Sequence, residues 1–571
     1  MSMYARQNQL LKLPLPRLRD TCDKLLEWSG VFLDQEELEA TATAVENFVS
    51  DPSSGPWYQH HLEKLNQQPE HLNWLEPLWK TAYLGNPDPL PMGGNVTFIA
   101  AKNPGTRALG LAKFVTSLIK GLVDFNRLIQ SESLEPDFQG KNPLCMTQYR
   151  TLFGTSRIPG REQDAYFINP TSRHVIVIHR GRHYALDVLD KEGNPVDSKK
   201  ITVSLQSLLA TDYPGNAESI GSLTSLGRRG WALSRQSLID LSEKNRRGFQ
   251  RIEGALAVIV LDENTYPDKD SMFKHLLGGD PSNRWYDKSL QFIIGDREDF
   301  GINYEHSGVD GTTLGRLVSY LYDHLEPLEV DSLPSGAADL EPIDFDMEPV
   351  HKKTIENALK QSRLDFDNLS LLLVSFDEFG KDHIKKIGVS PDAFLQLSLQ
   401  LAQYTLFGSV ANTYEAVMTK TFLGGRTETM RPVTRESLAF VREPDSRNLK
   451  IAAEKHIQRI RECQQGQGVD RHLFGLRTMH ERYRPDTPLP PVFQSPGYLK
   501  LTTSYFSTST SSSKGMLYAG YGPLIDDGYA ARYLIFSDRL TFVLSAKKGN
   551  ESLLKAYRIH LVGALRTMGA L

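Results

Sequence analysis

An acidic stretch interrupted by prolines divides this chain into two long parts. Residues 327–350 contain four prolines, Pro327, Pro334, Pro342 and Pro349, among several acidic side chains. Proline breaks helices and is excluded from central strands, so such a stretch is typical of a connection between folded units. A chain of 571 residues also exceeds the size at which a single hydrophobic core stops growing. We therefore expect two domains, residues 1–347 and residues 348–571.

Strand-like and helix-like patterns alternate on both sides of this connection. Before it, residues 173–179 and 183–189 form two short apolar runs around a turn, which predicts a β-hairpin. After it, residues 369–376 predict a strand, and Ser390-Pro391 marks the start of a helix that continues to about residue 407. Long helices mixed with strands indicate an α/β fold in both halves.

Composition excludes several classes of protein. Hydrophobic residues make up 40% of the chain and charged residues 23%, as in a folded globular protein. The net charge of -4 argues against a general nucleic-acid binder. The cysteines, Cys22, Cys145 and Cys463, have neither a disulfide nor a metal-ligand pattern and fit a reducing compartment. No apolar run approaches the length of a bilayer span and no signal peptide is evident, so we expect a cytoplasmic protein without a transmembrane segment. Peripheral membrane contact and a removed transit peptide stay open.

A histidine that follows a predicted strand is the first candidate for chemistry. His306 comes after the strand-like residues 300–304, and Asp310-Gly311 then opens a segment of helical periodicity. This is the His-x-x-x-Asp-Gly arrangement of CoA-dependent acyltransferases. Imidazole titrates near neutral pH and can take a proton from a hydroxyl or a thiol. The pattern alone is weak, because most of the 15 histidines in the chain are expected to be structural or on the surface.

Cationic and hydroxyl-bearing segments in the second half add further candidates. Lys381 and Lys385 precede the helix start at Ser390, and positive charge near a helix N-terminus suits a phosphorylated ligand. Arg471 can bind a carboxylate through two hydrogen bonds. Residues 507–511 offer hydroxyls that can stabilise an oxyanion. A solvated charge run, a surface ion pair and an ordinary loop are the respective alternatives.

Taken together, these segments resemble the carnitine/choline acyltransferase family, and in particular its carnitine O-acyltransferase branch. The matching blocks lie in family order along the chain: residues 80–84, 152–160 and 283–288, His306-Ser307 with Asp310-Gly311, Ser390-Pro391-Asp392, residues 425–429, Asp470-Arg471-His472-Leu473 and Ser507-Thr508-Ser509. The resemblance implies two α/β domains of the chloramphenicol-acetyltransferase type. Each would contain a mixed sheet flanked by helices, with an active-site tunnel between the domains. It also implies that residues 87–107 cross over to pack with the second domain.

The resemblance also implies a role for each candidate residue. His306 would be the general base, Asp310 the acidic residue that follows it, and Ser509 the hydroxyl that stabilises the oxyanion. Lys381 and Lys385 would meet CoA phosphates with Asp392 nearby, and Tyr414, Thr427 and Arg471 would hold the carnitine carboxylate. Transfer would be direct, in a ternary complex with acyl-CoA as co-substrate. We expect no metal, no permanently bound cofactor and a monomer.

Three places in the chain bear on the substrates. Choline acetyltransferases resemble Val-Asp-Asn where this chain has Thr427-Glu428-Thr429, and they lack the arginine found here at 471, so carnitine is preferred over choline. Ala519 stands where short-chain enzymes have methionine, and a small side chain there favours medium to long acyl groups. A short-chain carnitine acetyltransferase, a choline-type enzyme and a non-catalytic acyl-CoA or acylcarnitine binding protein are the alternatives.

Overall fold

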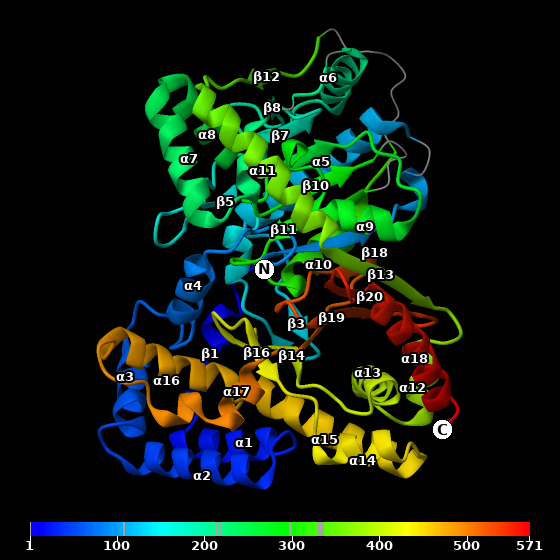
Figure 1. The fold of residues 1–571 in the computed structure, drawn as a ribbon. Coiled ribbons are helices and arrows are strands. Elements are labelled where there is room, and N and C mark those ends of the chain that lie inside the picture. The colour runs from blue at the N-terminus through cyan, green and yellow to red at the C-terminus, as the bar shows by residue number, and fades with distance from the viewer. Residues whose placement is uncertain (1, 107–108, 213, 217, 296–299, 328–335) are drawn as a thin grey trace.

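Two mixed β-sheets form the core of the protein, one in each half of the molecule (Figure 1). The computed structural model describes residues 2–106, 109–212, 214–216, 218–295, 300–327 and 336–571. Helices pack against both sheets, which confirms the predicted α/β class with a mixed sheet flanked by helices in each half. Among the described residues, no helix combines the length and apolar character needed to cross a membrane.

The first sheet contains strands from most of the first half of the chain. In spatial order they are β12 (Leu340–Ile343), β8 (Arg182–Asp187), β7 (His174–His179), β9 (Val258–Leu261), β10 (Gln291–Ile294), β11 (Phe300–Glu305), β2 (Asn95–Ala100) and β18 (Met516–Gly520). β9 runs parallel to both of its neighbours, and the other pairs are antiparallel. The central strands β7, β9, β10 and β11 are buried along their whole length, which requires helices on both faces.

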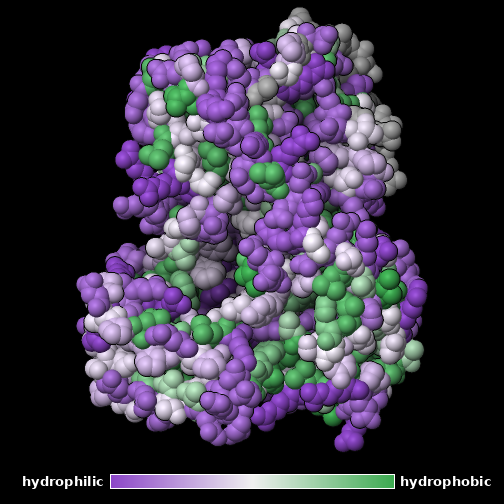
Figure 2. Space-filling view, in the orientation of Figure 1, coloured by the Kyte–Doolittle hydropathy of each residue, from purple (hydrophilic) through white to green (hydrophobic). Residues whose placement is uncertain are grey.

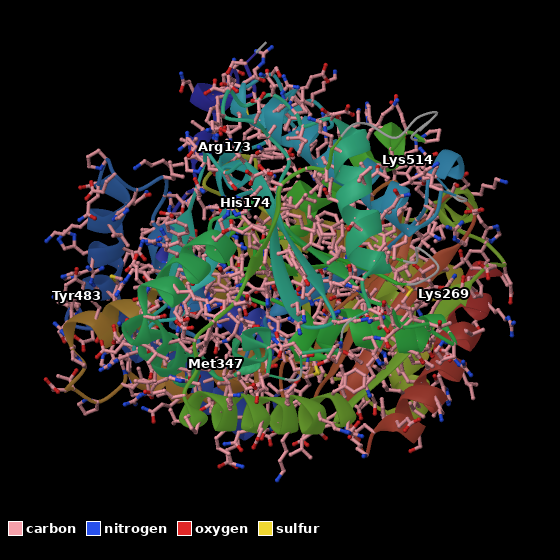
Figure 3. The ribbon with its side chains drawn as sticks, turned by 90° about the horizontal axis from the view of Figure 1, so that it is seen from above. Arg173, His174, Lys269, Met347, Tyr483 and Lys514 are labelled. Atoms are coloured by element: carbon pink, nitrogen blue, oxygen red, sulfur yellow. The ribbon has the colours of Figure 1, made fainter. Side chains whose placement is uncertain are left out.

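Two groups of helices provide this cover. One face packs against α5 (Leu111–Gln130), α6 (Ser198–Ala210) and α10 (Gly311–His324). The other packs against α7 (Arg228–Leu241), α8 (Glu243–Glu253), α9 (Lys269–Gly278) and α11 (Pro349–Asp367). Seen from above, α11 runs along one side of the molecule from near Met347 (Figure 3).

The second sheet contains strands from the second half alone. In spatial order they are β13 (Leu369–Phe376), β20 (Leu540–Lys547), β19 (Tyr529–Ile535), β17 (Phe506–Thr510), β14 (Thr413–Met418) and β16 (Thr427–Met430). One face packs against α12 (Lys381–Ile387), α13 (Pro391–Phe407), α14 (Arg435–Arg442), α15 (Ser446–Gln464) and α18 (Glu551–Gly569). β17 runs parallel to β14 and to β19, so all three present their side chains in matched register.

The N-terminal helices pack with the second half of the chain. A third hydrophobic core joins α1 (Leu18–Ser29), α2 (Gln35–Ser50), α3 (Gly55–Gln67) and α4 (Glu76–Gly85) to α16 (Asp470–Tyr483) and α17 (Pro496–Thr502). Figure 1 shows these blue and orange helices side by side. Trp28 and Trp74 are fully buried in this core. Residues 1–347 therefore do not pack as one unit.

A strand from the second half also enters the first sheet. The resemblance implies that residues 87–107 cross over to the second domain, and this expectation is corrected by the strand pairing. β2 lies between β11 and β18, and the register pairs Phe98 with Ala519. The strand that crosses is therefore β18. Residue 107 lies outside the described residues.

The proline-containing connection has a structure of its own. Leu340–Ile343 forms β12, which pairs antiparallel with β8 at the edge of the first sheet. Pro342 is tolerated there because an edge strand has one row of unpaired backbone groups. Residues 328–335 lie outside the described residues, and α11 begins at Pro349.

Several short elements complete the chain. Two-residue or four-residue strands pair as β1 (Leu11–Lys12) with β15 (Phe422–Leu423), β3 (Phe138–Gln139) with β4 (Asn142–Pro143), and β5 (Thr155–Ile158) with β6 (Ala165–Ile168). The parallel β1–β15 pair is a further tie between the N-terminal segment and the second half.

Candidate active site

A cavity of about 420 Å³ lies between the two sheets. Its walls come from the end of β11, the start of α10, and strands β14, β16, β17 and β19. The space-filling view shows the molecule hollowed between its two halves (Figure 2). A concave site at a junction between two packed units is the usual place for small-molecule chemistry.

The structure brings together most of the residues selected from the sequence. The cavity is lined by His306, Asp310, Ser509, Tyr414, Thr427 and Arg471. On β14, and on β17 as far as Ser509, the lining residues alternate with residues that point to the helices behind the sheet, as the pleat of a strand requires. Tyr414 and Ser509 face the cavity, whereas the Thr508 hydroxyl donates to the backbone oxygen of Tyr414, at 2.7 Å.

His306 is held in the tautomer that a general base needs. Its Nδ1 lies 2.7 Å from the backbone oxygen of Val309. A carbonyl can only accept a hydrogen bond, so Nδ1 carries the proton and Nε2 keeps a free lone pair. Burial lowers the pKa of His306, as does the charge of Arg426, and these effects outweigh the opposite influence of Asp310. The imidazole is therefore neutral and ready to accept a proton near neutral pH.

Asp310 organises the loop around His306 and forms no hydrogen bond with the imidazole. Its carboxylate accepts from Arg426 Nη2 at 2.8 Å and from Gln148 Nε2 at 2.6 Å. Arg426 also donates to the backbone oxygens of His306, at 2.8 Å, and of Ser307. Burial would raise the pKa of Asp310, but Arg426 holds it well below its usual range. Asp310 is thus a permanent anion that fixes Arg426, and Arg426 fixes the backbone that carries the base.

Sequence reasoning did not select Arg426 as a site residue. It precedes Thr427 in a block that matches the family, but its two backbone acceptors lie about 120 positions away in the chain, at His306 and Ser307. Only the packing of the two halves reveals this role. Its position beside a predicted ligand residue was the available signal.

A buried chain of charged groups supports the end of β11. Glu305 accepts from the Ser307 hydroxyl at 2.5 Å and from Arg157 Nη1 at 3.3 Å. Arg157 also binds Asp164, which in turn binds Arg228. Alternating charges of this kind compensate one another in a dry environment. The strand that leads to His306 is therefore anchored on both sides.

Arg471 is a buried cation whose guanidinium forms no close ion pair, although the charges of Glu428 and Asp470 act on it from a greater distance. Its side chain stacks on Trp79, with Cζ 3.8 Å from the ring centroid, and its Nε donates to the backbone oxygen of Thr427 at 3.2 Å. No carboxylate of the described residues lies within ion-pair distance of the guanidinium. Such a cation in a cavity is ready to bind an anion, and Trp79 and Thr427 fix its orientation.

Comparison with known proteins identifies the family. Residues 13–561 match the family described as "Choline/Carnitine o-acyltransferase". The chain belongs to this family of acyltransferases. Carnitine O-acetyltransferase of Rattus norvegicus is 30% identical over 95% of this chain and 90% of that protein. Mitochondrial carnitine O-palmitoyltransferase 2 of the same organism is 28% identical over 96% of this chain and 89% of its own. Both the family resemblance and the expectation of an enzyme are confirmed.

Solved structures with a similar trace are more distant. The trichothecene 15-O-acetyltransferase of Fusarium sporotrichioides aligns with a TM-score of 0.40 at 9% identity, covering 86% of this chain and 93% of its own. A wax ester synthase/diacylglycerol acyltransferase from Marinobacter aquaeolei aligns with a TM-score of 0.36 at 11% identity, covering 87% of this chain and 100% of its own.

The residues expected to contact CoA in this family lie outside the cavity. Lys381 and Lys385 belong to the short helix α12, where Lys381 is half-buried and Lys385 is exposed. Asp392, in the first turn of α13, accepts from the Tyr533 hydroxyl at 2.7 Å. These positions lie on the helical side of the second sheet, and the cavity lies on its other side.

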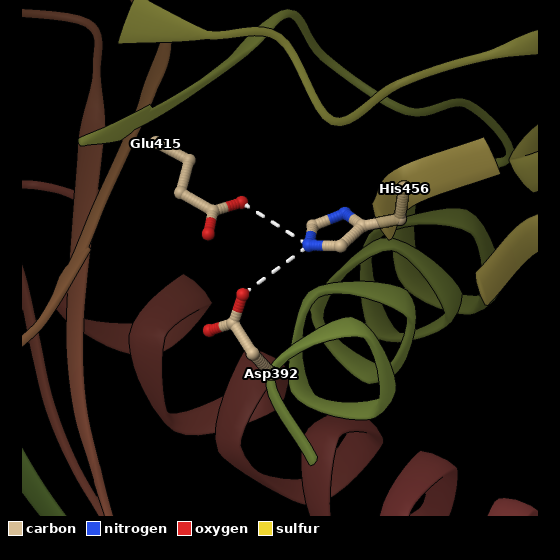
Figure 4. Close-up of side chains that lie close together, drawn as sticks. All are labelled: Asp392, Glu415 and His456. Atoms are coloured by element: carbon tan, nitrogen blue, oxygen red, sulfur yellow. Dashed lines mark hydrogen bonds and ion pairs between the residues drawn. The ribbon is translucent and has the colours of Figure 1, made fainter. Parts of the chain in front are cut away.

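Asp392 belongs to a compact cluster with Glu415 and His456 (Figure 4). His456 Nε2 lies 3.3 Å from Asp392 and 3.7 Å from Glu415. Within the described residues, these three side chains are close enough together to be considered as metal ligands. Burial and the neighbouring charge of Asp392 raise the pKa of Glu415 well above its usual value. The two carboxyl groups therefore share a proton at neutral pH, because two carboxylates this close cannot both ionise.

This shared proton predicts a measurable dependence of stability on pH. Glu415 keeps its proton when folded and loses it when unfolded above about pH 4.3. The contribution of Glu415 to the stability of the folded protein is therefore complete below that pH. It is lost as the pH rises towards the pKa of Glu415 in the folded protein. Relative to Glu415→Gln, the wild type should lose about 1.4 kcal/mol of stability per pH unit over this range. Thermal unfolding of both proteins between pH 5 and pH 7 measures the difference.

Asp392→Asn is the matched control for this experiment. Burial would raise the pKa of Asp392, but His456 and Tyr533 together lower it, so this group is already ionised above its ordinary pKa. Asparagine at position 392 removes the charge that raises the pKa of Glu415, so the stability of this variant should fall less steeply with pH than that of the wild type. A difference in stability between wild type and Glu415→Gln that stays constant with pH would show that Glu415 is ionised in the folded protein.

Ala519 does not line the cavity directly. It lies on β18, is 1% exposed and packs in the hydrophobic core beneath the first sheet. Its register partner Phe98 contacts Arg532, a cavity-lining residue whose Cζ lies 5.1 Å from the centroid of the Phe98 ring.

Proposed function

We propose that the protein catalyses the reversible transfer of an acyl group between CoA and the hydroxyl of carnitine. The observation that carries this proposal is the unpaired guanidinium of Arg471 in the cavity that contains Nε2 of His306. Carnitine presents a carboxylate to this cation, and choline does not. Enclosing Arg471 beside choline would leave a buried charge without a partner, which is costly.

The chemistry follows from the groups in the cavity. Nε2 of His306 removes the proton of the carnitine hydroxyl, and the oxygen attacks the thioester carbonyl of acyl-CoA. The Ser509 hydroxyl donates to the oxyanion of the tetrahedral intermediate. When the intermediate collapses, the C–S bond breaks and the leaving thiolate takes the proton back from His306. The balance requires no acyl-enzyme, and none of the three cysteines lines the cavity.

CoA and carnitine have separate sites in this proposal. Tyr414, Thr427 and Arg471 surround the carnitine carboxylate within the cavity. Lys381 and Lys385 remain our proposed contacts for the CoA phosphates, supported by their charge and by the absence of a carboxylate within ion-pair distance among the described residues. Medium to long acyl groups remain our expectation, and the small side chain of Ala519 is its basis.

The test is an assay of acceptor-dependent transfer. Purified protein is incubated with acetyl-, hexanoyl- or palmitoyl-CoA and with carnitine, choline or no acceptor, and the ester product is measured by mass spectrometry. We expect ester formation with carnitine and little with choline. Binding of acyl-CoA without any ester product would favour a binding protein, and a preference for choline would contradict the assignment of Arg471.

A further inference from the structure

A second arginine in the cavity also lacks an anionic partner. Arg532 lies on β19, where the register pairs it with Ser509 on the neighbouring strand. The residue is 4% exposed, and its Nη2 donates to the hydroxyl of Ser511. Its Nε has no hydrogen-bond partner, and no carboxylate of the described residues lies within ion-pair distance. A buried guanidinium without an ion-pair partner destabilises the folded protein unless a bound ligand supplies an anion.

The other two arginines that line the cavity form ion pairs. Arg157 binds Asp164 and Glu305, and Arg426 binds Asp310. Arg471 and Arg532 are left, among the cavity arginines, without carboxylates in the described part of the chain. The carboxylate of the acceptor is a single anion, so it cannot pair with both arginines if they lie against different walls of the cavity.

The two unpaired arginines do lie against different walls. Arg471 stacks on Trp79. Arg532 lies over Phe98 of β2, with Cζ 5.1 Å from the ring centroid, and its Nη2 lies close to Gly311 at the start of α10. An added Cβ at Gly311 would lie only 3.0 Å from this nitrogen. The acceptor carboxylate and Arg532 thus belong to separate parts of the cavity.

A second polar atom without a partner lies beside Arg532. The ring of Tyr304 stacks on Phe98, with centroids 5.6 Å apart, and its buried hydroxyl lies beside the guanidinium of Arg532 without a well-directed hydrogen bond. Arg532 Nε and the Tyr304 hydroxyl are both donors, and the residues that carry them both line the cavity. The first turn of α10 adds N–H groups that have no intrahelical acceptor. This wall therefore presents donors to the cavity, and the charge of Asp310 at the N-terminus of α10 is already paired with Arg426.

We propose that Arg532 and Tyr304 bind a carboxylate at the far end of the transferred acyl group. Among acyl groups of similar length, the enzyme then prefers the CoA monothioester of a dicarboxylic acid, such as glutaryl-CoA, so the charge at the far end is a determinant separate from the chain length expected from Ala519. This inference rests on the proposed function and deepens it, because Arg532 lies over Phe98, the register partner of Ala519, and Ala519 is the position on which the expected acyl site is based. A plain alkyl chain in the same space would leave the guanidinium desolvated and unpaired.

The test compares acyl groups that differ at the far end. Succinyl- and glutaryl-CoA are compared with pentanoyl- and hexanoyl-CoA at saturating carnitine, and acylcarnitine formation is measured by mass spectrometry. We expect the wild type to prefer the carboxylated groups. Arg532→Met should lower kcat/KM for glutaryl-CoA by about 100-fold, because it removes one partner of a buried ion pair. The same variant should keep or improve activity on hexanoyl-CoA, with an unchanged KM for carnitine.

Two further variants make the outcome decisive. Arg532→Lys keeps the charge and should retain part of the preference for glutaryl-CoA. Arg471→Met should raise the KM for carnitine without changing the preference between acyl groups. Thermal unfolding of each variant establishes that it is folded.

Three results would overturn the inference while the proposed function stands. The wild type could transfer hexanoyl groups to carnitine and reject both carboxylated groups. Arg532→Met could leave the ratio of glutaryl to hexanoyl transfer unchanged. It could also lower both rates equally, which would place Arg532 at the oxyanion or the CoA thioester. The absence of carnitine-dependent transfer with every acyl-CoA would instead contradict the proposed function itself.

Discussion

Replacement of His306 with alanine is expected to lower kcat by about 10³-fold while leaving carnitine binding intact. A positioned general base contributes on this scale, and no other group in the cavity has an unprotonated ring nitrogen held in place as Nε2 is. Carnitine binding should survive because its carboxylate is held by Arg471, on a different wall. Single-turnover kinetics and equilibrium binding of carnitine measure the two effects separately.

Val309→Ala is a suitable control for this experiment. It changes a buried side chain next to the site and keeps the backbone oxygen that orients the imidazole. We expect most of the activity to remain, with a modest loss of stability from the smaller side chain. Near-normal turnover by His306→Ala would remove the histidine from the mechanism and require another base.

Replacement of Arg471 with asparagine is expected to raise the KM for carnitine by about 100-fold. The guanidinium is buried against Trp79 and is oriented by the backbone of Thr427, so its interaction with a carboxylate is strong. Its removal also takes away the unpaired charge that disfavours choline, so acetyl transfer to choline should improve. Steady-state kinetics with both acceptors give the ratio of kcat/KM for choline to kcat/KM for carnitine.

Arg477→Asn provides the comparison. Arg477 lies on the same helix, α16, and its Nε pairs with Glu481 at the surface. Replacement of this surface arginine should leave the KM values for carnitine and choline unchanged, because exposed ion pairs contribute little to stability. An unchanged KM for carnitine in Arg471→Asn would show that the acceptor binds elsewhere, and the proposed function would lose its main support.

The sequence could predict the parts of the site that depend on local patterns. His306 and Asp310 are close in the chain, and the strand before them and the helix after them follow from hydrophobic periodicity. Tyr414, Thr427 and Ser509 belong to strands whose alternation places them on one face. Their family blocks then indicated what that face would bind.

The remaining features depend on tertiary packing. Arg426 acts on backbone oxygens in the other half of the chain, and no local pattern announces such a contact. Arg532 looks like an ordinary polar residue of a strand until β19 pairs with β17 and Phe98 covers its side chain. The crossing of β18 also escaped prediction, because strand exchange between halves leaves no periodic signal in either strand.

The exchanged segments limit how this enzyme can move. β18 is hydrogen-bonded into the sheet of the opposite half, while α1, α2 and α3 pack onto α16 and α17. A hinge motion that separates the two halves would break the backbone hydrogen bonds of β18 and divide the hydrophobic core between the N-terminal helices and α16 and α17. Reactants must therefore enter and leave along fixed walls, by side-chain and loop motion. The spacing between the base and both unpaired arginines is set when the chain folds, before any substrate arrives.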